Sequence, residues 1–354
     1  SIPHITAIRR IFEEEYVWMD RFTMRNLELF HSTNPNGVAL IEVLDHTLTA
    51  MGGRMLKHRL AFPERNLKVI EHRLDIVAAF VKYSKAFEIL ENHLRQMVDI
   101  ERMVAKIATQ KISPRALVQM EKSLEEIDQM KDYLAKQPDK VLKEEAKDIR
   151  DNKQISGLIQ STLQPEAPVL ISKGEVIAQG VDNELDGLRD LLRSGKDHLD
   201  KMLERESERT QIPSLKIAFN NVFGYYIEVR NTHKDKVPED WIRKQTLVNA
   251  ERYITEELKE YETKILGAEE KIKSIESHLY AALITELQQH IDLLKQNAAA
   301  VAQLDVLWSF ADLALKNNYT RPEFSGETLL EVKEGRHPVI EHQLPPGTPF
   351  LAND

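Results

Sequence analysis

Residues 258–282, LKEYETKILGAEEKIKSIESHLYAA, decide the fold. Their apolar positions recur at steps that alternate between three and four residues: Leu258, Tyr261, Ile265, Ala268, Ile272, Ile275, Leu279 and Ala282. This spacing places one apolar stripe along a helix and is typical of a helix that packs lengthwise against a partner. The sequence therefore predicts a long helix here with a second helix beside it.

That second helix is predicted upstream, over residues 183–209. Its stripe is made of apolar residues at helical spacing: Leu185, Leu188, Leu192, Leu199, Met202 and Leu203. Asp182 or Asn183 can cap its start, and Thr255 can cap the returning helix, which we expect over residues 255–296. At about 1.5 Å per residue, the two helices would span roughly 40 Å and roughly 60 Å.

The residues between these helices show the alternation of β-strands. Apolar residues alternate with polar or small ones in two segments, residues 215–220 and 225–230. Residues 221–224 would form the turn, where Gly224 can adopt a positive φ. Residues 244–254 are a third extended stretch. The sequence therefore predicts an arm made of an outgoing and a returning helix, with a small β-rich module at its tip.

Charge limits the classes of partner. The 354 residues carry a net charge of −9, so the chain is not basic over its whole surface. Residues 212–252 contain seven Lys or Arg and five Asp or Glu, so this segment is +2 and the remainder is −11. This mild polarisation suits weak phosphate contact rather than tight binding of nucleic acid.

Several other classes are disfavoured. The absence of cysteine excludes disulfides and thiolate metal sites. No uninterrupted apolar run approaches about 18 residues and residues 1–20 lack a signal-peptide core, so we expect a soluble, cytoplasmic protein with no membrane partner. His337 and His342 have no third ligand at helpful spacing, so no metal site is expected.

No catalytic residue is expected either. The chain has no G-x-x-x-x-G-K-[ST] phosphate loop and no Ser-His-Asp or paired-carboxylate constellation that stands out. Residues 169–171 and 176–177, with Gly174 between them, suggest a short hairpin. After Tyr319 the character changes to a strand-like and proline-rich stretch that looks like the first piece of another domain.

Two interpretations of the tip stay open. In the first, backbone N–H groups, amide side chains and a few cations meet a nucleic-acid phosphate backbone without reading bases. In the second, the chain is a coiled-coil scaffold whose polar β tip ends the helix pair or binds a protein. Spacing alone does not separate them.

Longer motifs resemble one family. FNNVFGYYIEV (219–229), RKQTLVNAERYITEELKEYETKIL (243–266), KNNYTRPEF (316–324), EGRHPVIE (334–341) and FLAND (350–354) closely resemble the bacterial MutS mismatch-repair proteins, as do RNLELF (25–30) and MGGRMLKHRL (51–60). The resemblance covers essentially the whole chain. It implies a mainly α fold: a helical core with long antiparallel lever helices and a small β-rich clamp inserted at their tip.

The resemblance also implies the domain boundaries. Residues 1–205 would be the helical core and outgoing lever helix, residues 206–254 the clamp, residues 255–322 the returning lever helix and core, and residues 323–354 the start of a truncated ATPase domain. In the family, two clamps of a homodimer close over double-stranded DNA and contact its backbone without sequence preference. A MutL-type repair partner is implied for the full-length protein.

The implied DNA-binding residues lie in the clamp. The hairpin-turn residues Asn220, Asn221, Val222 and Gly224 are the first candidates. The further candidates are Lys216, Lys244, Gln245, Thr246, Asn249 and Arg252. Phe350 and Leu351 match positions that pack on the adenine of ATP in the full-length protein, which also uses Mg.

The resemblance also implies that this chain is the middle of a longer protein. It lacks the mismatch-reading domain and the phosphate loop, so we expect no cofactor, no mismatch recognition and no ATP hydrolysis in it. A MutS-like relative with another DNA-recombination role is the alternative within the family.

Overall fold

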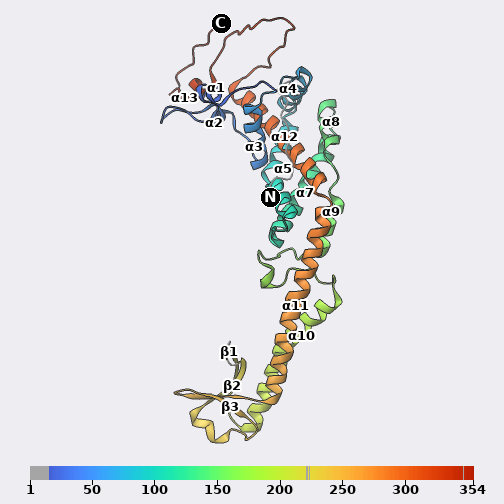
Figure 1. Ribbon diagram of the computed structural model, residues 1–354, viewed down its shortest axis with the longest axis vertical. Coiled ribbons are helices and arrows are strands. Elements are labelled where there is room, and N and C mark those ends of the chain that lie inside the picture. The colour runs from blue at the N-terminus through green and yellow to red at the C-terminus, as the bar shows by residue number, and fades with distance from the viewer. Residues whose placement is uncertain (1–15, 221, 223, 346) are drawn as a thin grey trace. The chain divides into compact units, whose positions relative to one another are not determined.

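The computed structural model describes residues 16–354, apart from residues 221, 223 and 346 and the side chain of Lys196. The fold is mainly helical with one four-stranded antiparallel sheet (Figure 1), which confirms the predicted class. The chain forms two compact units. Unit 1 contains residues up to 112, 119–157 and 287–354, and unit 2 contains residues 113–118 and 158–286.

Unit 1 is a helical bundle. Its helices are α1 (Arg21–Asn26), α2 (Leu40–Leu44), α3 (Ala50–Ala61), α4 (Leu67–Lys82), α5 (Ser84–Arg95), α6 (Ile100–Ala108), α8 (Lys140–Asp148), α12 (Ile291–Asn317) and α13 (Pro338–Gln343). Three further helices have residues in both units: α7 (Pro114–Ala135), α9 (Lys153–Thr162) and α11 (Glu256–Gln288). Helix α12 packs against α3, α4 and α6 and forms the centre of unit 1.

Buried polar groups fix α12 in that position. The Asp305 carboxylate accepts hydrogen bonds from the backbone N–H groups of Leu48 and Thr49, both at 2.8 Å, and from the Thr49 hydroxyl at 2.6 Å. Burial raises the pKa of Asp305, and these hydrogen bonds act in the opposite direction. The bonds join segments more than two hundred residues apart, so they specify which face of α12 points inward.

Helix α12 is long and apolar enough to cross a membrane by length and composition, and two thirds of its apolar window (67%) is buried within the protein. It carries Asn297, Asp305 and Asp312 among its buried residues. These are features of the core helix of a globular unit.

Unit 2 is built around a helix pair. Its elements are η1 (Ile171–Lys173), α10 (Asn183–Thr210), β1 (Lys216–Asn220), β2 (Gly224–Arg230), η2 (Asn231–Lys236), β3 (Ile242–Thr246), β4 (Ala250–Ile254) and α11. Ion pairs join Glu184 to Lys271 and Arg205 to Glu257, so residue numbers fall along α10 as they rise along α11. The two helices are antiparallel neighbours with the sheet inserted between them in the chain (Figure 1).

Both predicted helix caps form. The Asp182 carboxylate accepts a hydrogen bond from Leu185 N at 2.8 Å, and the Thr255 hydroxyl accepts one from Leu258 N at 3.1 Å. Helix α11 ends at Gln288, so the expected end at residue 296 is wrong. The break at residues 289–290 separates α11 from α12.

The apolar stripe of α11 departs from its predicted spacing. Four predicted positions are buried: Leu258, Ile265, Ala268 and Ile272. Three others, Tyr261, Ile275 and Leu279, are only half-buried, and Ala282 is exposed. Instead, the buried positions continue through Glu276, Tyr280 and Leu283. A straight α-helix repeats every 3.6 residues and drifts away from a strict heptad, so the inner face rotates along the helix.

Gly195 permits a close approach of the two helices. A Cβ atom at this position would lie 2.5 Å from the Tyr261 hydroxyl and 3.2 Å from Ile265. One turn away, the His198 ring stacks on Tyr261 with centroids 5.5 Å apart. Close packing therefore explains why α10 tolerates a glycine at this position.

The sheet has the order β1-β2-β4-β3, and every neighbouring pair is antiparallel. The two predicted strands are β1 and β2. The third stretch, expected as one segment over residues 244–254, is a hairpin of β3 and β4 with a register irregularity between Arg243 and Gln245. Polar Asn249 lies in the turn that interrupts the stretch.

The short hairpin expected around Gly174 is wrong. Residues 171–173 form the 3₁₀ turn η1, and Gly174 follows it with φ of 74°. The Val176 carbonyl accepts a hydrogen bond from Gln164 N at 2.9 Å, and the Val176 N–H donates to the Glu276 carboxylate at 3.0 Å. Both backbone groups that a hairpin would use are therefore already bonded elsewhere.

Candidate nucleic-acid interface

The sheet has two unlike faces. One face contributes Ile227, Val229 and Tyr253 to a buried cluster with Met202 of α10 and Leu258 of α11. On the same side, Tyr225 packs edge-on against Tyr261 of α11, with centroids 5.6 Å apart. Alternation along the strands turns the intervening residues to the opposite face, so that face is the available one.

A polar row crosses the available face from edge to edge. Lys216 of β1 lies opposite Glu228 of β2, Glu228 lies opposite Arg252 of β4, and Arg252 lies opposite Gln245 of β3. We call these four residues the cross-strand row. The row contains one side chain from each of the four strands. The sequence had marked three of these side chains as candidates: Lys216, Gln245 and Arg252.

Arg252 is held tightly within the row. Its guanidinium lies 4.2 Å from the centre of the Tyr226 ring, donates to Gln245 Oε1 at 2.9 Å and lies 3.4 Å from Glu228 Oε2. Its side chain is 18% exposed. Stacking on an aromatic ring orients the guanidinium, and the hydrogen bonds to Gln245 and Glu228 use Nη1 and Nε.

The β1–β2 turn holds the first group of candidates. The Asn220 carboxamide oxygen accepts a hydrogen bond from Val222 N at 2.8 Å, and Val222 is strongly exposed. Asn221 lies outside the described residues. Gly224 is buried, with φ of 76°, and a Cβ there would overlap the Glu262 carboxylate, which accepts a hydrogen bond from Tyr225 N at 3.1 Å. Gly224 is thus needed for the turn to approach α11.

The second group surrounds the β3–β4 turn. Lys244, Thr246 and Asn249 are all exposed there. The turn is tied to the end of β2, because Asn231 N donates to Asn249 O at 3.1 Å and Asn231 Nδ2 donates to Val248 O at 2.9 Å.

The two groups of candidates lie at opposite ends of the sheet. Gly224 begins β2 next to the first turn, and Arg230 ends it opposite Ala250, next to the second turn. Seven residues of strand separate the ends by about 20 Å at about 3.3 Å per residue. The candidates therefore form two separate patches, and the cross-strand row lies nearer the second.

The cations of residues 206–254, which we call the sheet module, differ in whether the described residues give them a bonding partner. Arg243 lies 3.4 Å from Glu251, Arg252 is paired with Glu228, and Lys236 donates to the Gln211 carbonyl at 3.2 Å. The described residues provide no carboxylate partner for four other cations: Lys216, Arg230, Lys234 and Lys244. These ion pairs leave the net charge of the module unchanged, but they leave the four cations without a carboxylate partner open to an anion.

Arg230 is a further candidate that reasoning from the sequence did not mark. It is exposed at the end of β2, next to the β3–β4 turn. The alternation of β2 carried the signal, because a residue that follows inward-facing Val229 faces outward.

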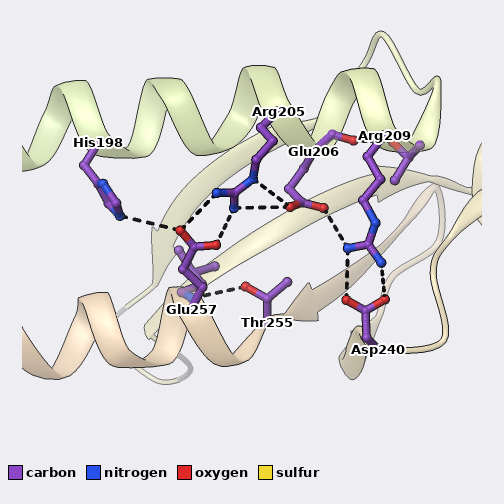
Figure 2. Close-up of polar contacts among 9 residues, drawn as sticks. His198, Arg205, Glu206, Arg209, Asp240, Thr255 and Glu257 are labelled. Carbon is purple, nitrogen blue, oxygen red and sulfur yellow. Dashed lines mark hydrogen bonds and ion pairs between the residues drawn. The ribbon is translucent and has the colours of Figure 1, made fainter.

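A polar network joins the sheet module to the helix pair, as Figure 2 shows. Arg205 of α10 pairs with Glu257 in the first turn of α11, and His198 lies 3.8 Å from the same carboxylate. Arg209 makes two hydrogen bonds to Asp240, at 2.7 Å and 3.0 Å. These contacts connect the end of α10 with the start of α11 and with the segment before β3.

Hydrogen bonds and burial shift the pKa values of several groups in and near this network. The hydrogen bonds from Arg209 lower the pKa of Asp240, and those from Arg205 to Glu257 raise the pKa of Arg205. In the sheet, burial raises the pKa of Tyr253 to about 12, with a hydrogen bond to Glu251 adding to the effect. Asp240 and Arg205 therefore keep their charges at neutral pH.

The adenine-packing candidates belong to unit 1. Phe350 is half-buried and Leu351 is exposed. Asn353, two residues after Leu351, exchanges two backbone hydrogen bonds with Gly335, at 2.7 Å and 3.2 Å.

Comparison with known proteins gives a consistent result. Residues 22–311 match the family model described as MutS domain III. The chain is 52% identical over 354 residues to the DNA mismatch repair protein MutS of Flavobacterium psychrophilum. It is 53% identical to that of Flavobacterium johnsoniae over 353 residues and 48% identical to that of Bacteroides fragilis over 354 residues. Each alignment covers 100% of this chain and 41% of the relative's length.

Proposed function

This chain belongs to the MutS family of DNA mismatch repair proteins, and on that premise we propose that residues 206–254 form a clamp that contacts the phosphate backbone of duplex DNA. The observation that carries the proposal is the available face of the sheet. That face presents Lys216 and Arg230, and Lys244 is exposed at the register irregularity of β3; none of the three has a carboxylate partner among the described residues. Lysine and arginine contacts to phosphate give affinity without sequence information.

The contact is expected to be non-specific. The elements of the module are short strands and a short 3₁₀ turn, and none of its described segments is a helix of the kind that enters a major groove. Tyr225, an aromatic that could stack on bases, is engaged with Tyr261. Exposed cations and polar turns therefore favour backbone contact over base readout.

We propose that α10 and α11 act as a lever for this clamp. The buried pair of Arg189 with Glu276, at 2.6 Å, and the exposed pair of Arg205 with Glu257 tie the helices together at two points far apart along their length. A helix pair joined in this way moves as one body and can carry a change at one end to the other. In the full-length protein that change would be the nucleotide state of an ATPase domain.

The remaining roles of the full-length protein are inferred from the family. We propose that residues 323–354 begin an ATPase domain in which Phe350 and Leu351 pack on the adenine of ATP, with Mg as the metal. The full-length protein would act as a cytoplasmic homodimer that responds to DNA damage with a MutL-type partner. The chain as it stands is expected to turn over no ATP.

A salt titration of duplex binding tests the clamp proposal. The 354-residue chain is titrated into a labelled matched duplex, and Lys216→Gln, Arg230→Gln and Lys244→Gln are combined in one variant. Each lost phosphate contact should lower the slope of log K against log salt by about 0.9, so the triple variant should lose up to about 2.7.

A matched control removes three exposed cations of unit 1, Lys85, Lys111 and Lys143, by the same change to Gln. This control should keep the slope of the unsubstituted chain. Equal loss in both variants would mean that the binding is a bulk charge effect, and a clear preference for a mismatched duplex would contradict non-specific contact.

A further inference from the structure

An acidic residue lies in the middle of the surface that we propose meets phosphate. Glu228 is flanked by Lys216 on one strand and by Arg252 on the other. Its side chain is 33% exposed, so its charge faces the same solvent as the cations around it. A surface built only to attract phosphate would not place a carboxylate there.

Glu228 does not have to be an acid for the sheet to form. Arg252 keeps two contacts that do not involve it, the Tyr226 ring at 4.2 Å and Gln245 Oε1 at 2.9 Å. The Glu228 backbone takes part in the ladder through its strand partners, whatever its side chain. Its carboxylate acts mainly on the charge of the two flanking cations.

We propose that Glu228 is an internal competitor for phosphate that weakens the clamp's hold on duplex DNA. The inference rests on the proposed clamp function and adds to it the residue that limits affinity. The Glu228 carboxylate occupies Nε of Arg252, at 3.4 Å, the kind of donor that a phosphate oxygen would use. It also places a negative charge within a Debye length of any phosphate that reaches Lys216.

A weak hold suits a clamp that must close over duplex and open again. Neutralising Glu228 frees Arg252 for one further phosphate contact and removes the repulsion. The expected result for Glu228→Gln is affinity for matched duplex that rises about three- to tenfold, with a salt slope steeper by up to about 0.9.

The control variant is Glu239→Gln, which makes the same change in net charge. Glu239 is exposed and adjoins Asp240, which is bound to Arg209 at the end of α10, so it lies in the segment before β3 rather than on the cross-strand row. It should change affinity by less than about twofold. A second variant, Glu228→Gln combined with Arg252→Met, should lose most of the gain.

The outcomes separate the inference from the function on which it rests. Tighter binding by Glu228→Gln, but not by Glu239→Gln, supports the competitor role. If the unsubstituted chain binds duplex through Lys216, Arg230 and Lys244 but Glu228→Gln binds no tighter, the competitor role fails and the clamp stands. Equal gains from both acid substitutions also overturn it. A chain that binds no duplex even at about 50 mM salt overturns both.

Discussion

The ion pair of Arg189 with Glu276 offers the sharpest test of how the two long helices are held together. Glu276 is 0% exposed and Arg189 13% exposed, and their closest atoms are 2.6 Å apart. Glu276 also accepts a hydrogen bond from Val176 N at 3.0 Å, and Arg189 donates to the Ile177 carbonyl at 2.9 Å. The pair therefore joins α10, α11 and the segment before α10.

Replacing Arg189 by Met leaves a buried carboxylate with one backbone N–H as its partner. Removal of one member of a buried pair costs about 3–5 kcal/mol, because the remaining charge is uncompensated. Replacing both residues, as Arg189→Met with Glu276→Leu, removes the charge and leaves the Val176 N–H without its acceptor, which costs about 1–3 kcal/mol. The Ile177 carbonyl loses its Arg189 donor in both variants, so this loss does not affect the comparison. The double variant should thus be more stable than the Arg189→Met single variant.

The pair of Glu184 with Lys271 provides the control, since it joins the same two helices. Both side chains are more than half exposed, 56% and 55%, and such pairs contribute about 0.2–1 kcal/mol. Lys271→Gln should therefore destabilise unit 2 far less than Arg189→Met.

Native-state hydrogen exchange of amides in α10 and α11 is the suitable assay, because the chain has two units and no single two-state transition can be assumed. The opening free energy should fall by at least about 3 kcal/mol in Arg189→Met and recover in part in the double variant. Equal effects of Arg189→Met and Lys271→Gln, or a double variant as unstable as the sum of its single changes, would refute the reasoning.

Three further outcomes follow from the structure. Gly224→Ala should destabilise the β1–β2 turn by at least about 1–2 kcal/mol because of its φ of 76° and the nearby Glu262. Gly187→Ala, where a Cβ meets nothing within 4 Å, should stabilise α10 by about 0.5–1 kcal/mol, and native-state hydrogen exchange of amides in the two elements compares the variants. Thr255→Ala should cost about 1 kcal/mol by removing the cap of α11, and Thr255→Ser should restore it, as measured by exchange of amides in the first turn. Hydrogen bonds from Arg209 lower the pKa of Asp240 from 3.8, so the contact is fully present above pH 3.8 and is lost as the pH falls through the folded-state pKa. An NMR titration that finds the pKa of the Asp240 carboxyl at or above 3.8 would contradict the contact.

Local patterns predicted the elements that depend on neighbouring residues. The caps at Asp182 and Thr255, the range of α10 and the strands β1 and β2 all follow from side chains within a few positions of each other. For such elements the hydrogen-bonding partners are set by short sequence separation, which a single sequence displays.

Features that depend on distant residues were missed or misread. The expected hairpin at Gly174 fails because a carboxylate one hundred residues away takes the Val176 N–H. The inner face of α11 rotates from the predicted stripe toward Glu276, a charged residue that a hydrophobic pattern excludes from a core. Its partner Arg189 lies 87 residues away, and nothing in the spacing of either helix identifies it.

The candidate interface was predicted in part. The sequence marked Lys216, Gln245 and Arg252, and the sheet register brings all three into one row. The sequence could not tell that Arg252 is held by Tyr226 and Glu228 while Arg230 is exposed without a carboxylate partner among the described residues. That division depends on the strand order β1-β2-β4-β3, which places β4 rather than β3 beside β2.

Hydrogen–deuterium exchange of the whole chain with and without duplex DNA tests the central claim most directly. If the clamp meets the phosphate backbone, duplex at low salt should slow exchange in β1 to β4 and their two turns and leave the remaining amides of unit 2 unchanged. Slower exchange confined to residues outside 206–254, or none at concentrations where the duplex is bound, would contradict the account.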